Sequence, residues 1–158
     1  MSPTADTKKI ENMSNNRFKH QIVNTSLFKD LLEIKTVLFS LYENISSRNR
    51  RILDKLIDLL LEAQHLFYKA YKYCAFSDEE DIDKKKLYLV DELWVQMTIV
   101  DTEISFLINQ IRCYSCDNKN ISDKRIEELL RLSPKLIDSS EKWRQSIVNK
   151  MKNKTNKR

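Results

Sequence analysis

The chain of 158 residues contains no glycine, and this absence constrains its fold more than any other feature of its composition. Glycine is the residue that most readily takes a positive φ angle or lets a ligand approach the backbone closely. Glycine-rich phosphate loops, dinucleotide-binding fingerprints and nucleophile elbows are therefore excluded. Two-residue hairpin turns also favour Asn-Gly or Asp-Gly pairs. The composition predicts an all-α fold.

The stretch from Arg50 to Phe76 has the clearest helical pattern in the chain. Its apolar residues recur at alternating steps of four and three, as on a helix face that packs lengthwise against other helices: Ile52, Leu56, Leu59, Ala63, Leu66, Ala70 and Tyr73. A second row lies beside the first: Leu53, Ile57, Leu60, Phe67 and Cys74. Two rows are too wide for one partner helix, so the pattern predicts a bundle rather than a two-stranded coiled coil.

Three further segments show the same periodicity. The first begins at Ser26, its expected N-cap; the third follows a capping box at Ser77; and the last follows Ser122. Short connections make neighbouring helices antiparallel. We therefore predict an antiparallel up-down-up-down four-helix bundle over residues 26–152, with a disordered N-terminal arm (residues 1–25) and a basic C-terminal tail (residues 153–158).

Four residues carry specific structural expectations. Because the apolar phase continues across Pro134, we expect a kink there rather than a break; the alternative is a new helix with Pro134 at its first position. Asp91 and Asp101 interrupt the apolar stripe of the third helix and are expected at its solvated edge. Trp143 is expected in the core, beneath the connection between the first and second helices.

Several large apolar residues lie off the main rows: Phe28, Phe39, Leu61, Val95, Ile99 and Phe106. A lone four-helix bundle leaves some of them exposed, and exposed apolar patches mark interfaces. We therefore expect a homo-oligomer.

The cysteines and the apolar runs indicate the cellular compartment of the protein. The three cysteines are odd in number, which fits a reducing compartment rather than a disulfide framework. Residues 1–26 are polar and mixed in charge, so we expect no signal peptide, and no apolar run is long enough to span a bilayer. The expected protein is soluble and cytoplasmic.

Residues suited to catalysis or metal binding are sparse. Cys113 and Cys116 form half of a zinc-binding pattern, but no second pair follows. His20 and His65 are the only histidines, and neither is placed to activate a nucleophile. Helical nucleases of the HEPN type need an arginine four to six residues before the histidine, and His65 has none. We expect no enzymatic activity, metal or cofactor.

The basic residues are the remaining candidates for function. Lys and Arg number 28 against 23 Asp and Glu, a formal net charge of +5, which permits a nucleic-acid partner. The predicted topology gathers Arg48, Arg50, Arg51, Arg112, Lys119, Lys124 and Arg125 at one end of the bundle. Arg144, Lys150, Lys152 and Lys154 follow in a stretch that has no acidic residue after Glu141. Such convergence is typical of phosphate binding, although a merely solvated surface is an equal alternative.

The segment from Ile121 to Trp143 carries a family resemblance. The run Ile121-Ser122-Asp-Lys-Arg-Ile-Glu-Glu, followed by a late Trp143, resembles the last helix of a family of four-helix-bundle proteins. These are the accessory variability determinants of diversity-generating retroelements and the related ribosomal-RNA intervening-sequence proteins. The resemblance spans about residues 27–150 and includes the order of the four helices.

The resemblance implies a non-enzymatic partner of a reverse transcriptase. Such a protein assembles as a ring-shaped pentamer, binds template RNA and the polymerase through a basic surface, and supports cDNA synthesis. Two alternatives stay open: a protein–protein adaptor, and a bundle of the same family associated with ribosomal RNA.

Overall fold

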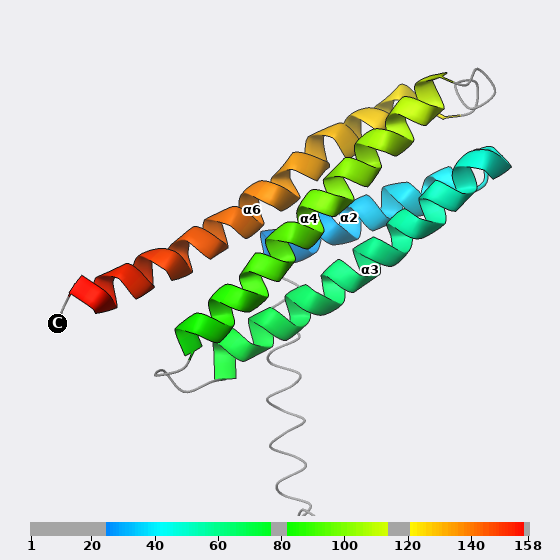
Figure 1. The fold of residues 1–158 in the computed structure, drawn as a ribbon. Helices are drawn as coiled ribbons and strands as arrows, with labels where there is room; N and C mark the ends of the chain where they lie inside the picture. The colour runs from blue at the N-terminus through cyan, green and yellow to red at the C-terminus, as the bar shows by residue number, and fades with distance from the viewer. Residues whose placement is uncertain (1–24, 77–81, 114–120, 157–158) are drawn as a thin grey trace, which may run out of the picture.

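The computed structural model describes residues 25–76, 82–113 and 121–156, and these ranges contain four helices and no strand. The helices are α2 (Ser26–Leu41), α3 (Ser47–Phe76), α4 (Ile82–Cys113) and α6 (Asp123–Asn156). The side chains of residues 74–76, 82–83 and 154–156 lie outside this description. The predicted all-α four-helix bundle is confirmed, with successive helices running in opposite directions (Figure 1).

Each helix packs against two others. The backbone of α2 lies close to α3 and α6, and that of α4 lies close to the same two helices, whereas α2 and α4 share no backbone contact within the described residues. Helices α2 and α4 therefore stand on one diagonal of the bundle, and α3 and α6 stand on the other. This arrangement follows from the short antiparallel connections that the sequence predicts.

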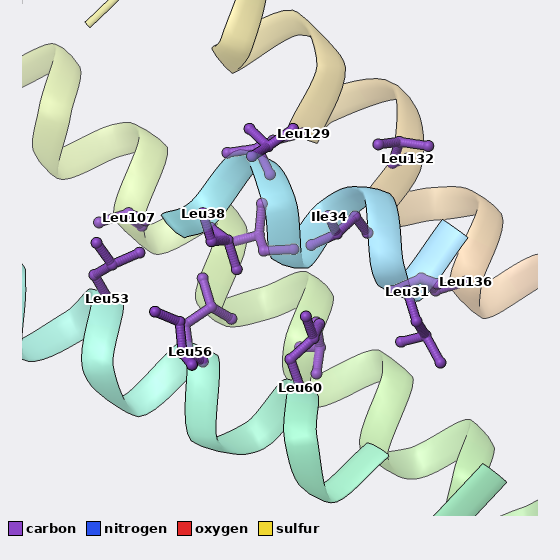
Figure 2. Packing of buried hydrophobic residues seen from close by; sticks show 14 of the residues in the cluster. Leu31, Ile34, Leu38, Leu53, Leu56, Leu60, Leu107, Leu129, Leu132 and Leu136 are labelled. Atoms are coloured by element: carbon purple, nitrogen blue, oxygen red, sulfur yellow. The ribbon is translucent and has the colours of Figure 1, made fainter. Parts of the chain in front are cut away.

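The core lies where rows of leucine and isoleucine from all four helices meet (Figure 2). The ten side chains that Figure 2 labels are all fully buried: Leu31, Ile34, Leu38, Leu53, Leu56, Leu60, Leu107, Leu129, Leu132 and Leu136. On α3, the two predicted rows supply the residues that face this core. The wide apolar stripe is thus satisfied by contacts with both α2 and α4.

The helix ends differ from the prediction by a few residues. The N-cap of α2 is Thr25, not Ser26, because the Thr25 hydroxyl accepts the backbone N–H of Phe28 at 3.3 Å. Helix α3 starts before the predicted Arg50, because the Ser46 hydroxyl accepts the backbone N–H of Asn49 at 3.4 Å. The expected cap of α6 is present, with the Ser122 hydroxyl accepting the N–H of Arg125 at 3.4 Å. The cap expected at Ser77 lies outside the described residues.

The predicted boundary between the bundle and the basic tail is wrong in its detail. Helix α6 continues to Asn156, so most of the segment 153–158 is helical rather than a separate tail. The lysines of this segment favour helix, and it contains neither proline nor glycine to end one.

Helix α6 is continuous through Pro134, so the alternative of a new helix starting there is wrong. Pro134 is exposed, and the neighbouring Ser133 is buried, where its hydroxyl donates to the Asp101 carboxylate. Asp91 and Asp101 are both partly exposed, which agrees with their expected place at the edge of α4.

Helix α2 covers only half of the bundle. It has 16 residues against 30, 32 and 34 in α3, α4 and α6, or about 24 Å against about 45–51 Å. Beyond its N-terminus, the half-buried Trp143 of α6 contacts Phe67 and Tyr71 of α3, with ring centroids 5.8 and 6.5 Å apart. The expectation that Trp143 lies beneath the α2–α3 connection is wrong, because that connection lies at the other end of the bundle, beside the start of α6 (Figure 1).

Candidate nucleic-acid interface

One end of the bundle gathers the C-termini of α2 and α4 and the N-termini of α3 and α6 (Figure 1). The structure places six of the seven basic residues predicted for this end there: Arg48, Arg50 and Arg51 on α3, Arg112 on α4, and Lys124 and Arg125 on α6. The seventh, Lys119, lies outside the described residues. The convergence that the topology predicted is therefore present for the described residues.

Most acidic residues at this end lie on α6, with Glu43 in the α2–α3 connection and Asp54 in the second turn of α3. The first two turns of α6 carry Asp123, Glu127 and Glu128 beside Lys124 and Arg125, so this corner has no excess of positive charge. The first turn of α3, in contrast, contains no acidic residue. The excess positive charge thus lies on α3 and on the last turn of α4, and we define the arginine cluster as Arg48, Arg50, Arg51 and Arg112, all four exposed.

The position of three arginines at the start of α3 adds to the positive electrostatic potential of this surface. The free backbone N–H groups and the helix dipole make a helix N-terminus positive, so cations there are unfavourable and anions are attracted. Arg48, Arg50 and Arg51 lie within the first five residues of α3. Their placement therefore costs stability and raises the affinity of this surface for an anion such as phosphate.

An aromatic residue lies beside the cluster. The guanidinium of Arg50 is 5.4 Å from the ring centroid of Tyr42, and the Tyr42 hydroxyl donates to Asp54 at 2.8 Å. The hydrogen bond to Asp54 raises the pKa of Tyr42 above its ordinary value. The Tyr42 side chain therefore links the end of α2 to both Asp54 and Arg50 of α3, while the Arg50 side chain remains exposed.

Arg51 borders a shallow groove between α3 and α4. The groove has a volume of about 570 Å³ and is lined by Arg51, Ile52, Lys55, Thr102, Glu103 and Phe106. Lys55 and Glu103 form an ion pair across it at 3.2 Å. The groove therefore combines an apolar floor with charged sides.

Arg125 has a structural role that sequence reasoning missed. It is half-buried, and its Nη1 donates to the backbone carbonyl of Ser40 at 2.9 Å. That carbonyl lies in the last turn of α2, where carbonyl groups lack partners within the helix. Arg125 therefore joins α6 to the end of α2, and its guanidinium is engaged in the fold.

Arg144 lies far from the arginine cluster, in the second half of α6. It forms an ion pair with Asp91 of α4 and lies over the ring of Trp94, with 5.6 Å between guanidinium carbon and ring centroid. The only signal for this role in the sequence is that Asp91 interrupts an apolar stripe. Arg144 contributes to packing between α4 and α6 rather than to a free basic surface.

The last basic candidates lie at the opposite end of the bundle. Lys150 and Lys152 are exposed on the last turns of α6. Lys154 belongs to the same helix, but its side chain lies outside the described part. These lysines and the arginine cluster therefore form two separate surfaces.

The described residues offer no cluster for metal chemistry. They contain no group of three or more His, Cys, Asp or Glu side chains that could hold a metal ion. Cys113 is an exposed free thiol, Cys116 lies outside the described ranges, and His65 is exposed on α3. None of the described helices is both long and apolar enough to cross a membrane.

Comparisons with known proteins identify no relative. The chain matches no family model, no curated protein and no solved structure.

Proposed function

We propose that this chain is a non-enzymatic accessory protein that binds RNA through the arginine cluster and supports cDNA synthesis by a reverse transcriptase. The observation that supports RNA binding is the start of α3, whose first five residues present three exposed arginines and no acidic residue at the positive end of a helix. Arginine can bind phosphate through two hydrogen bonds, so this surface suits a polyanion.

The biological setting is taken from the resemblance of the segment 121–143 to accessory proteins of diversity-generating retroelements. In this setting the protein works in the cytoplasm, binds template RNA and the polymerase, and assembles as a homo-oligomer, a pentameric ring by that resemblance. It positions the two partners and breaks no bonds. A ribosomal-RNA-associated role is the nearest alternative within the same family, and it uses the same phosphate-binding surface.

The test is an RNA titration at two salt concentrations with the variant Arg48→Glu, Arg50→Glu, Arg51→Glu. Each phosphate that a cation neutralises releases counterions, and for single strands each contact contributes about 0.7 to the slope of log affinity against log salt. We expect weaker binding, a shallower slope, and a similar loss for unrelated RNAs, because phosphate contacts carry no sequence information.

A matched control changes the same amount of charge at the opposite end of the bundle. Lys69→Glu, Lys72→Glu, Lys84→Glu alters three exposed lysines on α3 and α4. This control should bind RNA more tightly than the arginine variant does. Equal losses in the two variants would mean that net charge alone governs binding, and the arginine cluster would lose its assigned role.

A protein–protein adaptor is the second candidate, because several large apolar side chains on the outside of α4 are exposed, among them Val95, Ile99 and Phe106. If the wild-type protein shows no salt-dependent RNA binding, the adaptor function replaces the proposed one. If it binds ribosomal RNA and retroelement template RNA equally, the specific link to a retroelement is lost and the RNA-binding function stands.

A further inference from the structure

Helix α4 carries an apolar stripe on the side opposite the core. Tyr88, Val95, Ile99 and Phe106 are 63%, 48%, 40% and 47% exposed. Together with the exposed Glu92 and Thr102 they follow one another at steps of four, three, four, three and four residues. We call these six residues the outer stripe. Its spacing is that of a helix face which packs lengthwise against another helix.

No helix in the described ranges covers the outer stripe. The core side of α4 is formed by another row, which includes Val90, Leu93, Met97 and Val100, and α3 and α6 pack against α4 on this side. A bundle helix requires only one apolar face, and a second row of mostly apolar residues exposed over five turns marks an interface.

The order of residues along the outer stripe is symmetric about Met97. From either end it reads aromatic, polar, aliphatic, aliphatic, polar, aromatic. A two-fold axis near Met97 would place a second copy of α4 antiparallel to the first. It would then pair Tyr88 with the partner's Phe106, Glu92 with the partner's Thr102, and Val95 with the partner's Ile99. A surface that complements itself in this way is what an isologous dimer contact needs.

We propose that the outer stripe of α4 is the contact between two antiparallel copies of this chain. The flanking residues are compatible with this register, because the side chains of Asp91 and Gln96 already have partners in their own chain, Arg144 and the backbone carbonyl of Leu59. Glu103 is already paired with Lys55 of its own chain. The groove beside Phe106 provides space for the partner's Tyr88.

The outer stripe is a different surface from the arginine cluster, and its contact is of a different kind from the contact that closes a ring. A closed ring of five requires a head-to-tail contact between two different surfaces, whereas the outer stripe pairs with itself. The arginine cluster lies outside the stripe. Arg112 is 15 residues from Met97, so a dimer would place its two clusters about 45 Å apart along α4.

The expected dimer is weak. The stripe from Tyr88 to Phe106 is about 27 Å long, and one pair of helices of this length buries less than the about 800 Å² per partner of a standard interface. Sedimentation velocity on the full chain should therefore show the smallest species double in mass, and only at the highest concentrations.

The first test places a glutamate at one of two exposed aliphatic residues, Ile99 on α4 or Leu32 on α2. Ile99→Glu places a charge at the centre of the outer stripe and should abolish this doubling of mass. Leu32→Glu, on α2 and 47% exposed, changes a similar side chain on a helix that shares no backbone contact with α4, and it should leave the pairing intact. Circular dichroism should show that both variants melt like the wild type, since both positions are exposed.

The second test determines the register by cross-linking, in a chain whose native cysteines (Cys74, Cys113 and Cys116) are replaced by serine. Tyr88→Cys and Phe106→Cys are made as separate variants, mixed and oxidised. The mixture should give a disulfide-linked dimer, and each variant alone should not, because its own copies are about 27 Å apart along the helix.

Three outcomes would overturn the proposal. One is a wild-type chain that remains monomeric at every concentration. Another is an assembly, dimer or ring, whose mass is unchanged by Ile99→Glu. The third is a cross-link formed by each single-cysteine variant alone, which indicates parallel helices.

Discussion

The indole of Trp143 on α6 meets the ring of Phe67 on α3 edge to face, with centroids 5.8 Å apart and planes at 82°. The two helices share no backbone contact within the described residues, so aromatic side chains bridge the diagonal. This contact lies beyond the N-terminal end of α2, which has 16 residues.

Trp143→Ala should destabilise the bundle strongly. Removing a large aromatic side chain leaves a cavity, and the cost is about 3 kcal/mol, at the lower end of the usual range because Trp143 is only partly buried. Trp143→Phe keeps an aromatic contact with Phe67 and should lose less. Urea denaturation followed by circular dichroism measures both. Equal stability of the alanine variant and the wild type would show that the aromatic bridge does not support the fold.

Two adjacent leucines on α3 should respond very differently to truncation. Leu60 is fully buried, whereas Leu61 is 42% exposed. Leu60→Ala removes core contacts and should cost about 2–5 kcal/mol of unfolding free energy. Leu61→Ala serves as the matched control and should change stability by less than about 0.5 kcal/mol. A large loss in the Leu61 variant would place that side chain in an interface.

Arg144→Ala should cost more stability than Asp91→Ala. The two residues form an ion pair with side chains 36% and 44% exposed, and such pairs contribute about 0–1 kcal/mol. Arg144 also lies over Trp94, and that cation–π contact adds about 0.5–1 kcal/mol. Thermal unfolding of both variants gives the comparison. RNA affinity should not change in Arg144→Ala, and a clear loss would place this residue in the RNA-binding surface after all.

Arg125→Ala should lower the unfolding free energy, whereas Lys124→Ala, at the neighbouring residue, should not. Arg125 donates to the Ser40 carbonyl at the end of α2, and losing this bond should cost about 1–2 kcal/mol. Lys124 is exposed, and its removal should leave the unfolding free energy almost unchanged. Chemical denaturation measures both. Equal stability of the two variants would mean that the Arg125 contact does not stabilise α2.

The sequence predicted the helices and their buried faces well because both are local properties. Periodicity on α3 separates Leu60, which is buried, from Leu61, which is exposed, since adjacent residues on a helix point about 100° apart. The cap at Ser122 follows equally from local chemistry. Because the connections are short, the sequence also indicated that Arg48, Arg50 and Arg112 would meet at one end.

Only the tertiary structure decided which residues of different helices meet, because this depends on how far each helix extends and how it is aligned with its neighbours. Arg125 and Ser40 are 85 residues apart in sequence, and Arg144 and Asp91 are 53 apart. Whether such groups meet is set by the axial alignment of α6 with α2 and α4, which periodicity does not encode. For the same reason, Trp143 lies beside Phe67 rather than under the α2–α3 connection. The outer stripe of α4 could be recognised as uncovered only once α3 and α6 were seen to pack on the other side, because an apolar row in a sequence does not say which of its neighbours will bury it.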